Sequence, residues 1–327
     1  MNPLISIVIP NWNGKTLLER CLPSLSRLNY PNFEVIVVDN GSGDDSIGYV
    51  QSSFSHFRVI QLRHNTGFAH AVNVGIQASS GDYIALLNND TEVDPKWLTE
   101  LLIPFSQTKS IGIVASKLLN FYQRDTIDSA GDVLNIVGQG YAIGGGEKDG
   151  AEWNNGCYIF SGTGGASLYK RAVFNDIGFF EETFFMYFED VDLSYRAQRF
   201  GYTIWYQPTA VVYHIQKASS NRSKASLEYL LYRNFVINYL INTPRALFYR
   251  RYSLLKFCMV FVHTFYYQTR MGYVGAAIKT WLWLLSHIPL IIKLRNTRTK
   301  LAKPEVSDEY IESFIIDKKI KILSFRF

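Results

Sequence analysis

The sequence predicts an α/β fold, in which helices flank a mostly parallel β-sheet, followed by a helical C-terminal extension rich in basic and aromatic residues. Strand-like and helix-like segments alternate along the first ninety residues, as is typical of such a sheet. Residues 1–216 carry 14 Lys and Arg against 22 Asp and Glu, whereas residues 217–303 carry 15 against one. We therefore expect one domain over residues 1–216 and a distinct extension over residues 217–327.

The first four expected strands are short apolar runs, typical of strands that are buried on both faces. They are Ile5–Pro10, Phe33–Asp39, Phe57–Leu62 and Tyr83–Leu87. The spacing of apolar residues predicts helices over Leu17–Leu28 and Gly67–Ala78 between these strands. Sheets of this kind have right-handed crossovers and bind ligands beyond the carboxyl ends of their strands.

Polar residues follow three of these strands, at the edge where a ligand would bind. They are Asn11–Gly14 after the first strand, Asp39–Ser42 after the second and Asn88–Asp90 after the fourth. Each group alone is typical of an ordinary turn. Three groups on one edge, with carboxylates among them, favour a binding crevice.

The second part of the domain is less regular. Residues 125–165 are rich in glycine and polar residues, which predicts loops or short strands over the sheet edge. The stretch from Val191 to Phe200 has helical spacing, and Glu189, Asp190 and Asp192 stand at its start. These acids suit the positive end of a helix dipole. Three carboxylates beside the apolar run FFMYF exceed what helix capping requires, which favours a catalytic role.

Several other classes of protein are excluded. A content of 47% hydrophobic and 15% aromatic residues argues against a collagen-like or disordered chain. Gly14-Lys15-Thr16 is not the end of a P-loop, because the earlier glycine is replaced by Ile9. No G-x-G-x-x-G follows the first strand, and no HExxH or serine nucleophile elbow is present. The three cysteines form no CxxC pair, which fits a reducing compartment.

Five motifs occur in a specific order: SIVIPNWNG, VIVVDNGS, NTGFAHAVNVG, LLNNDTEV and FFMYFEDVDLSYRAQRFGY. Together they resemble the inverting glycosyltransferases of family 2, which have the Rossmann-like GT-A fold, over about residues 4–216. Within that family, IDSAGDVL at Ile127–Leu134 and GQGYAIGGGE at Gly138–Glu147 resemble bacterial rhamnosyltransferases of O-antigen and cell-wall linker synthesis.

The resemblance implies that residues 1–100 bind a nucleotide-diphosphate sugar and that residues 101–216 hold the acceptor and the base. In the family, the acid at Asp39 contacts the nucleobase or ribose, and the segment at Gly67 closes over the base. Glycine there permits close backbone approach. The residues assigned to the donor are Pro10, Asn11, Asn13, Asp39, Asn65, Gly67, Phe68, Asn88 and Asn89.

A divalent cation, Mg²⁺ or Mn²⁺, is expected because a diphosphate would be repelled by an acidic domain. Asp90 stands where the DxD motif of the family supplies its main metal ligand, and Asn88 replaces the first acid of that motif. His214 resembles a second metal or diphosphate ligand. The alternative for His214 is a histidine that merely ends a strand.

An inverting displacement needs one general base and one group that stabilises the departing charge. Asp190 resembles the base of the family, and the apolar residues beside it are expected to raise its pKa. Glu189 and Asp192 are expected to orient the acceptor or the base. The glycines of Gly162–Gly165 would let the acceptor approach the sugar.

The extension is expected to lie on an anionic membrane surface. Its longest stretches without charged residues are Phe257–Thr269 and Thr280–Ile292, shorter than the roughly 20 apolar residues of a spanning helix. Two interfacial helices are the better interpretation. The alternatives are a basic face docked on the acidic domain and a nucleic-acid-binding patch, and the apolar content argues against nucleic acid.

The sequence therefore predicts a metal-dependent, inverting glycosyltransferase, peripheral on the cytoplasmic face of the membrane. Its expected substrates are dTDP-L-rhamnose and a hydroxyl of a lipid-linked (polyprenyl-diphosphate) saccharide. One alternative is a transferase of the same fold with a UDP-hexose donor. The other is a catalytically silent membrane-bound protein that binds a nucleotide sugar.

Overall fold

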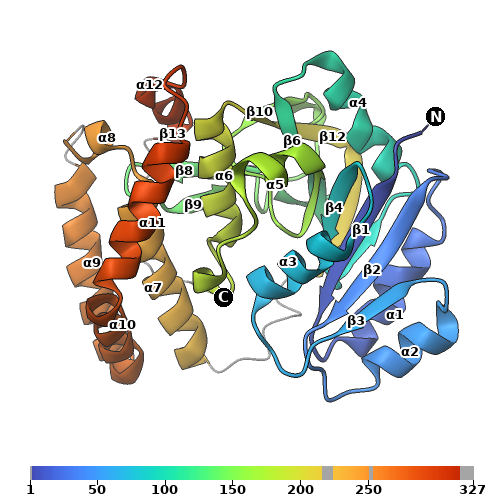
Figure 1. Cartoon of the computed structure of the whole chain (residues 1–327), viewed down its shortest axis with the longest axis horizontal. Coiled ribbons are helices and arrows are strands. Elements are labelled where there is room, and N and C mark those ends of the chain that lie inside the picture. The colour runs from blue at the N-terminus through green and yellow to red at the C-terminus, as the bar shows by residue number, and fades with distance from the viewer. Residues whose placement is uncertain (1, 216–223, 250–252, 317–327) are drawn as a thin grey trace.

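A computed structural model of the chain describes residues 2–215, 224–249 and 253–316. Its centre is a ten-stranded mixed sheet (Figure 1). The strands are β1 (Ile5–Asn11), β2 (Phe33–Asp39), β3 (Arg58–Gln61), β4 (Tyr83–Leu87), β5 (Thr91–Val93), β6 (Ile111–Asn120), β7 (Ile127–Ser129), β10 (Cys157–Ile159), β11 (Ala166–Lys170) and β12 (Thr203–His214). Their order is β10-β12-β6-β11-β4-β1-β2-β3, with β5 beside β12 and β7 beside β6.

The N-terminal half of this sheet is parallel, as the sequence predicts. β1 pairs in parallel with β2 and β4, and β2 pairs in parallel with β3. β11 is antiparallel to both of its neighbours, β4 and β6. A parallel partner requires a long crossover connection, usually a helix. The segment before β11 forms short strands and turns instead, so the second half of the sheet is mixed.

Helices cover both faces of the sheet. They are α1 (Lys15–Leu25), α2 (Ser46–Ser53), α3 (Phe68–Ala78), α4 (Trp97–Gln107), α5 (Arg171–Ile177) and α6 (Glu189–Phe200). Ile7 and Ile9 of β1 pack in one hydrophobic cluster with α1 and α4, whereas Val8 packs in the other with α3. This burial on two faces explains the continuous β-branched run of the first strand.

The region 125–165 contains short strands and turns, as predicted. β7 and β10 join the main sheet, and η1 (Ala151–Trp153) lies between them in sequence. A separate three-stranded sheet consists of β8 (Asp132–Asn135), β9 (Gly140–Ala142) and β13 (Ile315–Ile316). The C-terminal part of the described chain thus pairs directly with β8, a strand of the predicted first domain.

The C-terminal helices form a stack at the left of Figure 1. They are α7 (Lys224–Asn242), α8 (Arg245–Tyr249), α9 (Ser253–Arg270), α10 (Val274–Ser286), α11 (Ile288–Leu301) and α12 (Asp308–Glu312). α7 is almost entirely buried and packs against α6, α10 and α11. Phe235 and Phe257 share a hydrophobic cluster with Phe184 of η2 (Glu182–Phe184). The predicted boundary at residue 216 falls in 216–223, outside the described residues.

The helices differ from the two predicted interfacial helices, because the second predicted stretch, Thr280–Ile292, is divided between α10 and α11. Pro289 stands in the first turn of α11, where a missing N–H costs no hydrogen bond. Within the described ranges, no single helix is both long and apolar enough to cross a membrane, and α10 with α11 meets those criteria only as a pair bent by 67°.

Candidate active site

A cavity of about 620 Å³ lies beyond the carboxyl ends of β1 and β4, where a sheet of this topology binds its ligands. The described residues that line it include five carboxylates and neither lysine nor arginine. The structure brings eleven of the fourteen predicted site residues together there: Pro10, Asn11, Asn13, Asn65, Phe68, Asn88, Asn89, Asp90, Glu189, Asp190 and His214. It does not bring Asp39, Gly67 or Asp192 to the cavity wall.

Asp39 lies behind the wall and holds Asn11. Oδ1 of Asp39 accepts a hydrogen bond from Nδ2 of Asn11 at 3.2 Å, and its Oδ2 accepts one from the amide of Ser42 at 3.0 Å. Oδ1 of Asn11 in turn accepts from Nδ2 of Asn89 at 2.8 Å. In this structure Asp39 is therefore a buried support for Asn11 and the donor side, and its contact with a base or ribose stays a prediction.

Gly67 permits a close approach, but to a protein segment that the sequence did not indicate. Its φ is +94°, and a Cβ at this position would lie 2.5 Å from the carbonyl oxygen of Phe185. That oxygen accepts a hydrogen bond from the amide of Ala69 at 3.2 Å. The turn at Gly67 thus touches the segment that precedes α6.

Asn40, which sequence reasoning left as a turn residue, fixes the same turn. Its Nδ2 donates to the carbonyl of Gly67 at 2.9 Å, and its Oδ1 accepts from the amide of Thr66 at 2.9 Å. Asn40 directly follows Asp39, so the DNG sequence contained it. Its role depends on residues 26 and 27 positions away, which no local pattern shows.

His214 lies between two carboxylates. Its Nδ1 is hydrogen-bonded to Oδ2 of Asp128 at 2.5 Å, and its Nε2 lies 3.5 Å from Oδ1 of Asp90. Burial alone would lower the pKa of His214, but the hydrogen bonds and charges of Asp128 and Asp90 outweigh it and raise the pKa to about 10. Asp128 belongs to IDSAGDVL, the segment that resembles rhamnosyltransferases, and the sequence did not indicate it as a partner of His214.

The arrangement fits a cation held by few protein ligands. Among the described residues, no group of three or more His, Cys, Asp or Glu side chains is placed to hold a metal ion. Asp90 would supply one oxygen, and Nε2 of His214 would supply one nitrogen once a bound cation has displaced its proton. Mg²⁺ sites commonly combine one or two carboxylates with phosphates and water. Asp128 occupies the place of the carboxylate that orients a metal-binding histidine through its other ring nitrogen.

Glu189 and Asp190 form the opposite acidic element, at the start of α6. Oδ1 of Asp190 accepts a hydrogen bond from the amide of Val191 at 2.8 Å, and its Oδ2 accepts one from the amide of Gly164 at 3.3 Å. Burial raises the pKa of Asp190, and these amide donors oppose that rise. Gly164 belongs to the GTGG turn, which therefore contacts the predicted base directly.

Glu189 differs from its neighbour. It is buried, and its Oε2 has no hydrogen-bond partner within the described structure. Burial, followed by the charge of Asp190, raises the pKa of Glu189 well above its ordinary value. Asp190 accepts two amide hydrogen bonds that favour its charged form, whereas Oε2 of Glu189 has no such donor within the described structure. Asp190 is therefore the better proton acceptor of the two.

Asp132 is a further acid that sequence reasoning missed. It lines the cavity at the start of β8. Burial, and then the charges of Asp190 and Asp128, raise the pKa of Asp132 to about 7. Its proximity to Asp190 comes from the small sheet, so spacing along the chain did not reveal it.

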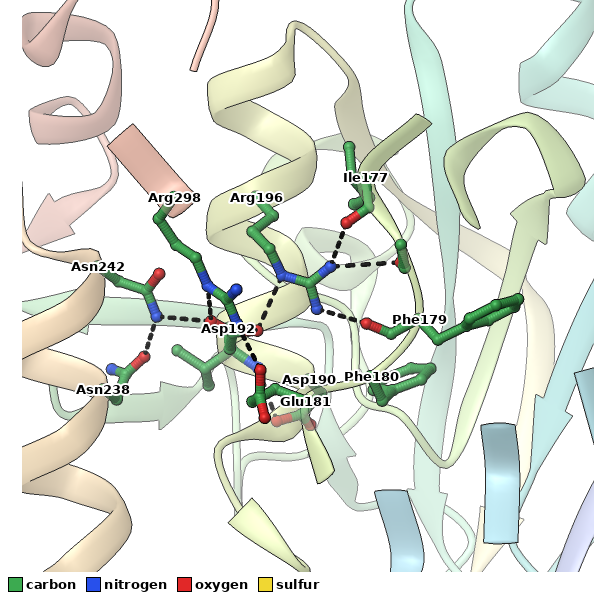
Figure 2. A network of polar contacts seen from close by, with 12 residues as sticks. Ile177, Phe179, Phe180, Glu181, Asp190, Asp192, Arg196, Asn238, Asn242 and Arg298 are labelled. Atoms are coloured by element: carbon green, nitrogen blue, oxygen red, sulfur yellow. Dashed lines mark hydrogen bonds and ion pairs between the residues drawn. The ribbon is translucent and has the colours of Figure 1, made fainter. Parts of the chain in front are cut away.

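Asp192 is fully buried in an ion-pair network (Figure 2). Its Oδ2 lies 2.9 Å from Nε of Arg196 and 3.1 Å from Nη2 of Arg298, and its Oδ1 accepts from Nδ2 of Asn242 at 3.1 Å. Asp192 has no exposed surface for contact with an acceptor, and its expected part in orienting the acceptor or the base stays a prediction. Asp192 instead joins α6 to α7 and α11.

The family model described as glycosyl transferase family 2 matches residues 6–192. The chain is 26% identical over 217 residues to poly-beta-1,6-N-acetyl-D-glucosamine synthase of Staphylococcus epidermidis, covering 63% of this chain and 48% of that protein. It is 28% identical over 229 residues to the O-antigen biosynthesis protein RfbC of Myxococcus xanthus, covering 66% and 18%. The chain thus spans less than half the length of these curated relatives.

Solved structures with a similar fold include GalNAc-T7 in complex with UDP, GalNAc and Mn²⁺. The TM-score is 0.67 at 15% sequence identity, and the match covers 95% of this chain and 56% of that one. At this identity the likeness concerns the fold, which is the Rossmann-like GT-A fold that the motifs predict. Since the family model covers more than half of the residues, the chain belongs to glycosyltransferase family 2.

Proposed function

We propose that the protein transfers a sugar from a nucleotide-diphosphate sugar to a hydroxyl group of an acceptor, with inversion at the anomeric carbon. One observation carries the proposal: the cavity joins the Asp90–His214 pair to the Glu189–Asp190 pair in a single space. A sugar donor with its diphosphate near the first pair would present its anomeric carbon to an acceptor near the second.

The charge of the cavity supports a requirement for Mg²⁺ or Mn²⁺. With five carboxylates and neither lysine nor arginine among its described lining residues, the cavity would repel a diphosphate. Asp90 and His214 would hold the cation, and Asp128 would orient His214. When bound, the cation supplies positive charge to the diphosphate. GalNAc-T7 carries Mn²⁺ with UDP, which supports the same requirement here.

The protein residues account for the proton. Asp190 removes the proton of the acceptor hydroxyl, and the oxygen forms a bond to the anomeric carbon while the bond to the diphosphate oxygen breaks. The proton stays on Asp190, and the nucleoside diphosphate leaves with the electron pair. Glu189 lies beside the base, and its raised pKa favours its neutral form, which limits the negative charge there. Gly164 leaves room near Asp190 for the acceptor, since it carries no side chain.

We propose L-rhamnose from dTDP-L-rhamnose as the sugar, on the likeness of IDSAGDVL and GQGYAIGGGE to rhamnosyltransferases. The alternative is a UDP-hexose, favoured by the N-acetyl-D-glucosamine synthase among the relatives. We propose a lipid-linked saccharide as the acceptor, in the synthesis of a cell-surface polysaccharide. The relative named for O-antigen biosynthesis supports this class of acceptor.

The C-terminal helices support a peripheral position on the cytoplasmic face of a membrane. No acidic residue occurs between Glu228 and Glu305. Large apolar side chains are exposed on α9, α10 and α11, among them Met259, Val262, Ile278, Leu282, Leu285 and Ile292. Apolar side chains together with cations suit an anionic lipid surface. At least one basic residue of the extension faces inward, because Arg298 pairs with Asp192. This contact supports, in part, the alternative in which a basic face of the extension packs against the acidic domain.

A screen of nucleotide sugars tests the proposal. The melting temperature is measured with dTDP-L-rhamnose, UDP-hexoses and GDP-mannose, each with and without Mg²⁺ or Mn²⁺, because a ligand that binds the folded state raises apparent stability. The stabilising donor is then incubated with a synthetic lipid-linked acceptor, and the anomeric configuration of the product is determined. Binding without transfer would support the catalytically silent binding protein. A retained configuration would exclude the single displacement.

A further inference from the structure

We propose that Arg233 and Asn234 of α7 are positioning residues for the base, because they hold the segment 184–188 that directly precedes Glu189 and Asp190. The proposal rests on the proposed function for the role of Asp190. It assigns to the C-terminal helices a part in catalysis that is separate from any contact with a membrane.

The segment has an unusual backbone. Phe185, Tyr187 and Phe188 have φ values of +66°, +71° and +71°, a region that bulky residues rarely adopt. Such conformations persist when the surrounding structure fixes them, and they occur at functional sites. Phe188 is the residue immediately before α6, so its backbone determines where Glu189 and Asp190 start. Other residues must therefore hold this segment in place.

Asn234 is one of the residues that hold the segment. Its side-chain amide is buried and faces three carbonyl groups of the segment. Nδ2 lies 2.8 Å from the oxygen of Phe184, 2.8 Å from that of Met186 and 2.9 Å from that of Tyr187. An amide has two hydrogens, so one of them is shared between two carbonyls. A single side chain thus holds three carbonyl groups of the segment, one of which belongs to the strained residue Tyr187.

Arg233 completes the arrangement. Its Nη2 donates to the carbonyls of Thr183 at 2.8 Å and Phe184 at 2.9 Å. Its Nε donates to Oδ1 of Asn234 at 2.9 Å. Because a guanidinium only donates, this contact requires the oxygen of the Asn234 amide to face Arg233 and the nitrogen to face the segment. The orientation of the asparagine is therefore fixed by its neighbour.

The held segment also forms part of the cavity. Phe185, Met186, Tyr187 and Phe188 line it, as does Leu231 of α7. Phe185 contacts the turn at Gly67 on the donor side. A displaced segment would therefore move the base relative to the donor. A misplacement of about 1 Å costs on the order of 100-fold in rate.

The test compares three variants with the wild-type full chain. Asn234→Ala removes the amide, and Asn234→Asp keeps the shape but presents oxygen to three carbonyls. The control is Tyr232→Phe, which removes another hydrogen bond of α7, from the Tyr232 hydroxyl to the carbonyl of Phe261 at 2.7 Å, and leaves the hydrogen bonds to the segment in place. The measurements are melting temperature, single-turnover transfer with the donor from the screen, and cleavage by chymotrypsin well below the melting temperature.

We expect both Asn234 variants to lose transfer by tenfold to about 100-fold and to shift the pH profile of the rate, while Tyr232→Phe keeps the wild-type rate and profile. We also expect Asn234→Ala to add little to the loss caused by Asp190→Asn, because a positioning residue acts through the group that it positions. Normal transfer by Asn234→Ala, or a full additional loss in the double variant, would overturn the proposal.

Proteolysis separates this proposal from the proposed function. The aromatic segment 184–188 offers sites for chymotrypsin, and we expect faster cleavage there in the Asn234 variants than in the wild type and in Tyr232→Phe. Equal cleavage in all four proteins would show that Asn234 does not hold the segment. This result would overturn the proposal even if the protein transfers no sugar. If Asp190→Asn transfers at the wild-type rate, the base assignment fails, and the role of Asn234 in positioning that base fails with it.

Discussion

Arg298 on α11 forms an ion pair with Asp192 on α6, with 3.1 Å between Nη2 and Oδ2, although the two residues are 106 positions apart. Arg196 shares the same carboxylate from within α6. Asp192 has no exposed surface, so its charge depends entirely on these partners and on Asn242. The C-terminal helices are therefore fastened to the helix that carries the predicted base.

We expect Asp192→Asn to destabilise the protein by about 3–5 kcal/mol, because it leaves Arg196 buried without a carboxylate and removes one of the two carboxylates that pair with Arg298. Burial opposes ionisation of Asp192, but the two arginines outweigh it and hold its pKa below the ordinary value. A lowered pKa contributes stability above about pH 4 that is lost as the pH falls through the folded-state pKa. Urea unfolding at pH 7 and pH 3 checks this: the difference between variant and wild type shrinks at pH 3. An equal difference in the free energy of unfolding at the two pH values would contradict a stabilising role of the Asp192 charge.

The metal assignment predicts graded losses. Asp90→Ala should abolish donor turnover at ordinary Mg²⁺ or Mn²⁺ and leave the melting temperature of the free protein nearly unchanged. His214→Ala should raise the metal concentration for half-maximal rate. Asp128→Asn should weaken metal affinity by about 10- to 100-fold, as loss of a carboxylate that orients a ligating histidine does. Titration of Mn²⁺ in the presence of the nucleoside diphosphate measures all three. Unchanged titrations would place the cation elsewhere.

The base assignment predicts that Asp190→Asn lowers single-turnover transfer by about 10²- to 10⁴-fold and leaves donor binding intact. Glu189→Gln is the matched control, because it replaces the neighbouring acid, whose raised pKa favours its neutral form, by a neutral side chain of similar shape. We expect a much smaller loss for Glu189→Gln. Donor affinity and transfer are measured on the same preparations. Equal losses in the two variants would indicate that the acids act together and not as base and neutral neighbour.

The membrane proposal predicts that Leu282→Asp with Leu285→Asp removes binding to vesicles of phosphatidylcholine and phosphatidylglycerol. Leu282 and Leu285 are 63% and 59% exposed on α10. The control is Tyr122→Asp, which changes a side chain that is 72% exposed outside the C-terminal helices. Attraction contributes about 1 kcal/mol per basic residue near an anionic surface, so wild-type flotation should weaken with salt. Equal flotation of all three proteins with the vesicles would refute the proposal that this face of α10 binds the membrane.

Much of the fold is predictable because its signals are local. The continuous apolar runs of β2 and β4 give these strands the bounds that the sequence predicts, and β3 differs by one residue at each end. The antiparallel β11 was not predictable in the same way. Its direction depends on the path of residues 125–165, whose glycines and polar side chains specify turns without specifying where they lead.

The site residues, too, are predictable where the signal is local and not where it depends on distant parts of the chain. Asp190 and Asp192 are two residues apart on a helix, and at about 100° per residue their side chains point about 200° apart. They cannot both face the cavity, so helical geometry alone already argued against a shared role. The sequence could not show that Asp192 meets Arg298, or that Asp128 meets His214, because those pairs lie 106 and 86 positions apart. Long-range pairing of charges, unlike burial, leaves no periodic pattern.

The contact between the turn at Gly67 and Phe185 joins the donor side of the cavity to the segment in front of Glu189 and Asp190. In the proposed reaction, a donor that orders this turn would also restrain that segment, since the two backbones touch. Such coupling is reciprocal: an acceptor that restrains the segment would tighten the binding of the donor by the same factor.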